Sequence, residues 1–276
     1  MNTNRKGIKG FLLAAGYGKR LLPLTKIIPK PLILFQKTPV IEHALRIFKK
    51  NDIEDVGINT HHLHNKISLY IKNQDILKKI FVSYEENKIL GTGGALSALD
   101  KWRKSSTLVV MNADVVHNYC LKKIIDLHFD SQNIATMALR EKPLYGETPI
   151  WCSNKQVLAI GGKKPSQQAK ARGFACIQVL SDKFIKQIPK NTFSCIIKTY
   201  QNQLKNNERV GFYLSNDFWY DLGTLDSLVN AHCHEKKISI KKIEDSILNC
   251  RHKSLPFYND GFRKCLSEML NEAQNP

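Results

Sequence analysis

Apolar and polar segments alternate regularly through the first half of the chain. Apolar runs of strand length are separated by longer stretches in which apolar residues recur every three or four positions. This alternation is typical of βαβ units, in which helices pack on a mainly parallel sheet. We therefore predict an α/β fold. The expected strands are 10–15, 55–60, 80–85, 106–114 and 134–139, and the expected helices are 39–51, 93–102 and 118–130.

The pattern changes after about residue 138. Loop-rich, basic segments alternate there with short apolar runs, which predicts a smaller substrate-facing half built onto the same sheet. The expected domain is therefore 1–234, with halves of about 1–138 and 139–234, and a C-terminal helical tail follows at 235–276. The expected elements of this region are strands at 157–160, 174–180 and 211–223 and helices at 194–207, 236–248 and 262–273.

Composition narrows the classes of partner. The formal net charge is +18, which fits either nucleic acid or an anionic small substrate beside a lysine-rich surface. The lysines are spread along the whole chain, and no basic stretch carries interleaved aromatic residues. We therefore expect no nucleic acid as a partner.

Two further features bear on location. No apolar run approaches the roughly 18 residues of a membrane span, so we expect no membrane association. The seven cysteines form no CxxC pair and are odd in number, which favours free thiols in a reducing compartment. The sequence predicts a cytoplasmic protein.

A Gly-x-Gly sequence with two cations directly follows the first expected strand. Gly16, Gly18, Lys19 and Arg20 lie in GYGKR, and Lys30 stands between two prolines ten residues later. Glycines let the backbone approach phosphate closely, and the prolines fix the backbone around the lysine. The loop is neither a GxxxxGK[ST] loop nor a GxGxxG loop, because a leucine stands where the third glycine would be. We interpret it as a different kind of polyphosphate-binding loop.

A second glycine cluster follows the third expected strand. Gly91, Gly93 and Gly94 in LGTGGAL would bring the backbone close to something flat or charged. The same pattern also suits the N-terminus of a helix, and both interpretations stay open on the sequence.

Two aspartates each end an expected strand. Asp114 ends VVMNAD and Asp221 ends FWYD. Carboxylates at strand ends are well placed to hold Mg²⁺, which takes oxygen ligands and bridges to substrate phosphates. A helix cap or a turn would explain either aspartate alone, whereas the pair favours a metal.

Taken in order, these four stretches resemble the sugar-1-phosphate nucleotidylyltransferases. They are most similar to the short branch of mannose-1-phosphate guanylyltransferases and N-acetylmuramate-1-phosphate uridylyltransferases, over residues 10 to about 234. The resemblance implies a Rossmann-like mixed sheet flanked by helices. It also implies Mg²⁺-dependent transfer from GTP or UTP to a sugar 1-phosphate, in nucleotide-sugar biosynthesis for cell-envelope polysaccharide. The protein would be a monomer or a homodimer.

The resemblance also implies roles for individual residues. Arg20 would bind the NTP phosphates and stabilise the transition state, and Lys30 would contact phosphate on the sugar side. Asp114 and Asp221 would hold Mg²⁺. The nucleotide would be lined by Leu13, Ala15, Gly16, Gly18, Lys19, Arg20, Glu86, Gly91 and Thr92, and the sugar phosphate by Lys30, Gly146 and Lys164.

Some positions depart from the family pattern. Ala113 stands where a glycine usually precedes the metal aspartate, Leu34 where a proline often follows PKPL, and Lys163 where a glutamate usually precedes KP. Residues 140–151, where sugar specificity should lie, match poorly. Two alternatives remain: transfer to a non-sugar phosphate such as phosphocholine, and a non-catalytic homologue that binds nucleotide sugar and regulates a partner.

Overall fold

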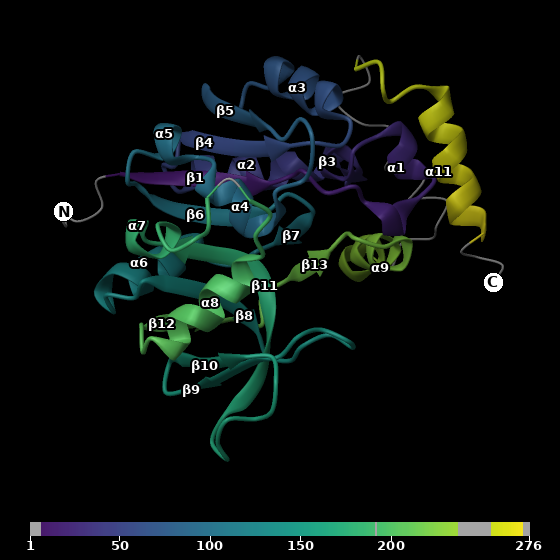
Figure 1. Ribbon diagram of the computed structural model, residues 1–276. Helices are drawn as coiled ribbons and strands as arrows, with labels where there is room; N and C mark the ends of the chain where they lie inside the picture. The colour runs from purple at the N-terminus through teal and green to yellow at the C-terminus, as the bar shows by residue number, and fades with distance from the viewer. Residues whose placement is uncertain (1–6, 191, 237–254, 273–276) are drawn as a thin grey trace.

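Figure 1 shows the computed structural model, which describes residues 7–190, 192–236 and 255–272 of the 276-residue chain. A nine-stranded mixed sheet runs through both halves, in the order β5-β4-β1-β6-β11-β8-β12-β10-β9. Its strands are β1 (Ile8–Leu13), β4 (Asp55–Thr60), β5 (Lys79–Tyr84), β6 (Thr107–Asn112), β8 (Ala135–Arg140), β9 (Ile150–Ser153), β10 (Gln156–Ile160), β11 (Lys170–Leu180) and β12 (Val210–Leu214).

Helices cover both faces of this sheet. Successive strand residues point to opposite faces, so Phe11 belongs to one hydrophobic core and Leu12 to the other. One core takes in α2, α3 and α6, and the other α4, α7 and α8. The helices are α1 (Leu24–Ile27), α2 (Val40–Lys50), α3 (His64–Asn73), α4 (Gly91–Ser97), α5 (Asp100–Arg103), α6 (Leu121–Asp130), α7 (Asp182–Ile185), α8 (Ile196–Lys205), α9 (Leu225–Lys236) and α11 (Asp260–Glu272).

The predicted α/β fold with a mixed sheet is confirmed. In the first half, β1 pairs in parallel with β4 and β6, and β4 pairs in parallel with β5. In the second half, β11 runs antiparallel to both β6 and β8, while β12 returns parallel to β8. The parallel half brings the carboxyl ends of β1, β4 and β6 to one edge, which is where ligands of such sheets bind.

Two expected elements are each divided in the structure. The expected strand 211–223 is β12 and a separate strand, β13 (Trp219–Asp221), which pairs with β7 (Val115–His117) in a small second sheet. A turn separates them, in which the Asp217 backbone N–H donates to Ser215 Oγ at 3.1 Å. The expected helix 93–102 is α4 and α5, and Ser97 Oγ at the end of α4 lies within hydrogen-bond distance of both the Gly94 and the Pro189 carbonyl oxygens.

The C-terminal tail is described in part. The expected helix 262–273 is confirmed as α11, which lies beside α1 (Figure 1). The expected helix 236–248 lies outside the described residues, apart from Lys236 at the end of α9. Across the described ranges, no helix combines the length and the apolar character that crossing a membrane requires.

Candidate active site

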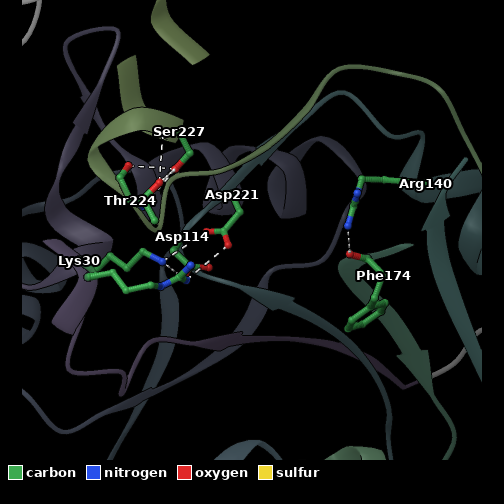
Figure 2. Close-up of polar contacts among 8 residues, drawn as sticks. Lys30, Asp114, Arg140, Phe174, Asp221, Thr224 and Ser227 are labelled. Atoms are coloured by element: carbon green, nitrogen blue, oxygen red, sulfur yellow. Dashed lines mark hydrogen bonds and ion pairs between the residues drawn. The ribbon is translucent and has the colours of Figure 1, made fainter. Parts of the chain in front are cut away.

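Lys30 lies at the centre of a cluster of four charged side chains. It opens the 3-10 helix η3 (Lys30–Leu32), and it is 9% exposed. Its Nζ contacts Asp114 Oδ2 directly and lies 3.4 Å from Asp221 Oδ1 (Figure 2). Arg20 Nη2 lies 3.7 Å from Asp221 Oδ2. The structure therefore brings together the two predicted catalytic cations and the two predicted metal ligands, which are far apart in sequence.

The small second sheet holds Asp114 and Asp221 close together. Asp221 is paired with Val115, the residue after Asp114, and the Leu222 backbone N–H donates to the Asp114 carbonyl at 2.9 Å. Asp221 therefore ends β13 and not a strand of the main sheet. The chain then turns into α9, where Thr224 and Ser227 cap each other's backbone N–H groups (Figure 2).

Because Gly223 has no side chain, the four charged side chains can occupy the space beside it. A Cβ at this position would lie 2.5 Å from Arg20 Nη2, 2.8 Å from Asp221 Oδ1 and 2.9 Å from Lys30 Nζ. All three distances are shorter than atoms tolerate. Gly223 is not among the site residues predicted from the sequence, although it stands in the motif WYDLGT that contains Asp221.

A cavity of about 210 Å³ opens beside the cluster at the carboxyl ends of β1, β4 and β6. A Cβ on Gly16 would meet no atom within 4 Å, so the backbone of the first loop faces open space there. The predicted site residues that line the cavity are Leu13, Ala15, Gly16, Lys30, Gly91, Thr92 and Asp114.

Other predicted site residues lie away from the cavity lining. Gly18 has φ +65° and its Cβ position is 2.7 Å from Thr25, so its role is in the turn of the loop. Arg20 reaches the site through Asp221. Exposed residues outside the lining are Lys19, Glu86, Gly146 and Lys164.

The second glycine cluster packs against the chain itself. Cβ atoms on Gly91, Gly93 and Gly94 would lie 2.6–2.9 Å from atoms of residues 192–194. The Gly93 backbone N–H also donates to the Ser194 carbonyl at 2.8 Å. Close packing against residues 192–194 therefore explains the three glycines, and it agrees with the interpretation of LGTGGAL as the N-terminus of a helix. Gly91 and Thr92 nevertheless line the cavity.

A buried polar chain that the sequence analysis missed ties three strand ends together. Asn59 lines the cavity and is 4% exposed. Its side chain accepts from the Ala14 backbone N–H at 2.8 Å and donates to Glu85 Oε1 at 2.6 Å. Glu85 Oε2 in turn accepts from the Leu90 N–H at 2.7 Å. These hydrogen bonds hold the loop after β1 and the loop before Gly91 in a fixed position relative to each other. The sequence signal was a polar residue inside an apolar strand.

Arg140 anchors the loop that joins β8 to β9. Its guanidinium carbon lies 4.2 Å from the centre of the Trp219 ring, and Nη2 contacts Glu147 Oε2 at 2.5 Å. Glu147 Oε1 accepts from the Phe174 N–H at 2.9 Å, and Phe174 O lies near Arg140 (Figure 2). These contacts connect residues 141–149 to β11 and to the strand that carries Asp221.

Cys176 lies next to the cluster on β11, in a left-handed backbone conformation with φ 59°. Burial raises the pKa of the Cys176 thiol, and the negative charges of Asp114 and Asp221 raise it further. The thiol therefore stays neutral near pH 7 and adds no third negative charge to the two carboxylates.

The two aspartates fit a magnesium ion. Asp114 Oδ1 is buried and has no hydrogen-bond partner among the described residues, so a ligand oxygen is left over for a cation. Mg²⁺ is commonly bound by one or two carboxylates together with substrate phosphates and water. Within 7–190, 192–236 and 255–272, no group of three or more His, Cys, Asp and Glu side chains is placed to hold a metal by itself.

Comparison with known proteins identifies the family. The family model for nucleotidyl transferases matches residues 9–238, most of the chain. The chain belongs to this nucleotidyl transferase family. The family predicted from the sequence motifs is thus confirmed, and the cluster and the cavity both lie inside the matched range.

Relatives of this nucleotidyl transferase include two yeast proteins. It is 27% identical over 222 residues to a mannose-1-phosphate guanyltransferase of Debaryomyces hansenii and 26% identical to one of Saccharomyces cerevisiae. Each match covers 78% of this chain and 61% of the relative. The chain therefore spans about three-fifths of the length of these relatives.

Solved structures share the fold. A putative glucose-1-phosphate thymidylyltransferase from Bacillus anthracis superposes with a TM-score of 0.70 at 22% identity, covering 84% of this chain and 96% of that one. A UDP-glucose pyrophosphorylase in complex with UDP-glucose gives a TM-score of 0.65 at 22% identity, covering 83% and 99%.

Proposed function

We propose that the protein transfers a nucleotidyl group from an NTP to a sugar 1-phosphate, with Mg²⁺, and releases pyrophosphate. The observation that carries the proposal is the arrangement of Lys30 and Arg20 on Asp114 and Asp221 beside the cavity. Family membership supports nucleotidyl transfer, and the mannose-1-phosphate guanyltransferases among the relatives support a sugar 1-phosphate as acceptor.

The proposed reaction needs no protein nucleophile. A phosphate oxygen of the sugar 1-phosphate, already ionised at neutral pH, forms the new bond to the α-phosphorus of the NTP. The bond from that phosphorus to the oxygen bridging to the β-phosphate breaks, and pyrophosphate leaves with the electron pair. Catalysis then consists of positioning and of neutralising charge.

Arg20 and Lys30 carry different parts of this task. Arg20 has an exposed side chain (65%) that is free to reach the NTP phosphates, where its planar guanidinium would stabilise charge in the transition state. Lys30 is buried and fixed, and it would hold the phosphate of the acceptor near the aspartates. Asp114 and Asp221 would hold Mg²⁺, which supplies neutralisation of phosphate charge when it is bound.

The choice of base is a separate proposal. We expect GTP, since the relatives named above are guanyltransferases. Glu86, as an acceptor, would suit the N1–H and N2–H₂ donors of guanine if the base extends beyond the cavity lining to this exposed residue. UTP is the second candidate. We further propose that the protein acts in the cytoplasm on precursors of cell-envelope polysaccharide, as a monomer or a homodimer.

The decisive experiment measures pyrophosphate release with four NTPs crossed against a panel of sugar 1-phosphates and phosphocholine, with Mg²⁺ and with EDTA. The expected result is release with one NTP and one sugar 1-phosphate, GTP with mannose 1-phosphate being the first pair, and none with EDTA. Release with phosphocholine alone would change the acceptor class. Tight binding of nucleotide sugar without any turnover would support the regulatory alternative and refute the proposed activity.

A further inference from the structure

The C-terminal segment lies against the outer side of the loop that carries Lys30. Tyr258 is 4% exposed, and its hydroxyl donates to the Leu32 carbonyl oxygen at 2.6 Å. Leu32 ends η3, two residues after Lys30, and is fully buried. The Lys30 side chain of η3 therefore points at the aspartates, while the backbone of η3 is held by the tail.

Apolar packing fixes the tail in this position. The side chains of α11 that are buried recur every three or four residues, as on one face of a helix. They share one hydrophobic core with Leu24, Ile28 and Leu32, which flank the Lys30 segment. The Tyr258 ring packs edge-on against Phe257 and Phe262. The buried face consists of Phe262, Cys265, Leu266, Met269 and Leu270.

The position of this segment in the chain sets it apart from the matched family domain. The family model ends at residue 238, and the relatives named above match 78% of the chain. Tyr258 and α11 lie beyond the family model. The contact with Leu32 is therefore made from outside the residues that the family model matches.

A buried carbonyl needs a hydrogen-bond donor, and its loss shifts the local backbone or leaves an unsatisfied group. The Leu32 carbonyl follows a turn in which the Leu32 and Ile33 N–H groups donate to Pro29 and Lys30 at 2.8 and 3.1 Å. Movement of Leu32 is thus passed directly to the backbone of Lys30. Because Nζ contacts two carboxylates, a shift of the Lys30 backbone changes how Nζ meets them.

We propose that residues 255–270 act as a clamp that fixes Lys30, with Tyr258 as its positioning residue. The catalytic consequence rests on the role proposed above for Lys30. The clamp acts through the Leu32 carbonyl and touches no substrate. It gives the tail a function in aligning the reaction site.

The test is a double-mutant cycle with Tyr258→Phe and Lys30→Ala, read as kcat/KM for the acceptor. Tyr258→Phe keeps the ring and removes the hydroxyl, and we expect kcat/KM to fall roughly tenfold in the wild-type background. In the Lys30→Ala background the same change should cost less than twofold, because the residue it positions is gone. An equal loss in both backgrounds would overturn the proposal.

The matched control is Tyr200→Phe. Tyr200 is fully buried and donates to Gln178 Oε1 at 2.7 Å, so it loses the same kind of hydrogen bond outside the site. We expect a similar loss of thermal stability but kcat/KM within twofold of wild type. A tenfold loss here as well would mean that activity merely follows stability, and the clamp would be refuted.

A second readout needs no substrate. Amide hydrogen exchange at Leu32 and Ile33 should be faster in Tyr258→Phe and unchanged in Tyr200→Phe. If the wild-type protein turned over no substrate pair, the proposed function would fail, and this measurement would still decide the clamp. Unchanged exchange in Tyr258→Phe would refute it.

Discussion

Gly223→Ala is predicted to separate activity from stability. The added methyl carbon would lie 2.5 Å from Arg20 Nη2 and 2.9 Å from Lys30 Nζ, against about 3.5 Å for an unstrained contact. It would also lie 2.8 Å from Asp221 Oδ1. All three side chains end in groups that can rotate, so the clash is relieved when each tip moves by roughly 0.5–1 Å. The fold is not required to move.

The magnitude follows from this displacement. A misplacement of about 1 Å at a reacting centre costs on the order of 100-fold in rate, or about 2.7 kcal/mol of activation free energy. Stability should change by less than about 1 kcal/mol, because alanine restricts the unfolded chain and Gly223 does not need a left-handed backbone.

The assay compares pyrophosphate release and urea unfolding for Gly223→Ala and the wild-type protein. A Gly223→Ala protein with kcat/KM within threefold of wild type would refute the placement of the reaction at this cluster. A loss of several kcal/mol of stability would refute the argument that only side-chain tips move.

Three further variants test other parts of the structure. Arg20→Ala should lower kcat by about 10²–10³ without altering the urea midpoint, since its side chain is 65% exposed. Asn59→Ala should cost about 1–3 kcal/mol in the free energy of unfolding, measured with urea, because Glu85 and the Ala14 N–H lose a buried partner. Burial lowers the pKa of His128 to about 4 from 6.5, so the unfolded chain binds a proton that the native chain does not between these values. His128 should therefore lower the free energy of unfolding by roughly 3 kcal/mol as the pH drops through this window, and His117, whose pKa burial also lowers to about 4, should add a similar fall. His128→Gln should remove its own share of that slope in urea titrations at pH 7 and pH 4.5.

The sequence predicted the core of the sheet well because apolar runs of strand length are a strong local signal. The strand expected at 55–60 is β4, and that at 10–15 overlaps β1. The sequence also singled out Lys30, because it stands between two prolines, and Asp114 with Asp221, because as a pair they each end an expected strand. The structure brings these three side chains together.

Other features could not be read from the sequence, for reasons that are physical. Residues 211–223 form one apolar pattern, and only a local turn at Ser215 sends Asp221 into a second sheet. Glycines at 91, 93 and 94 look the same whether they face a ligand or another chain segment. The hydrogen bond from Tyr258 to Leu32 joins positions 226 residues apart, and no periodicity encodes such a contact.

The charges of the cluster explain how a basic protein can hold its substrates without a strongly basic site. Lys30 and Arg20 are balanced by Asp114 and Asp221, so the fixed charges of the cluster sum to zero. A polyphosphate gains little net attraction from such a group alone. Long-range attraction must then come from the +18 net charge spread over the chain, and local attraction from a divalent cation on the aspartates. For the proposed function, the balanced cluster would favour a substrate that arrives with its metal over a bare anion.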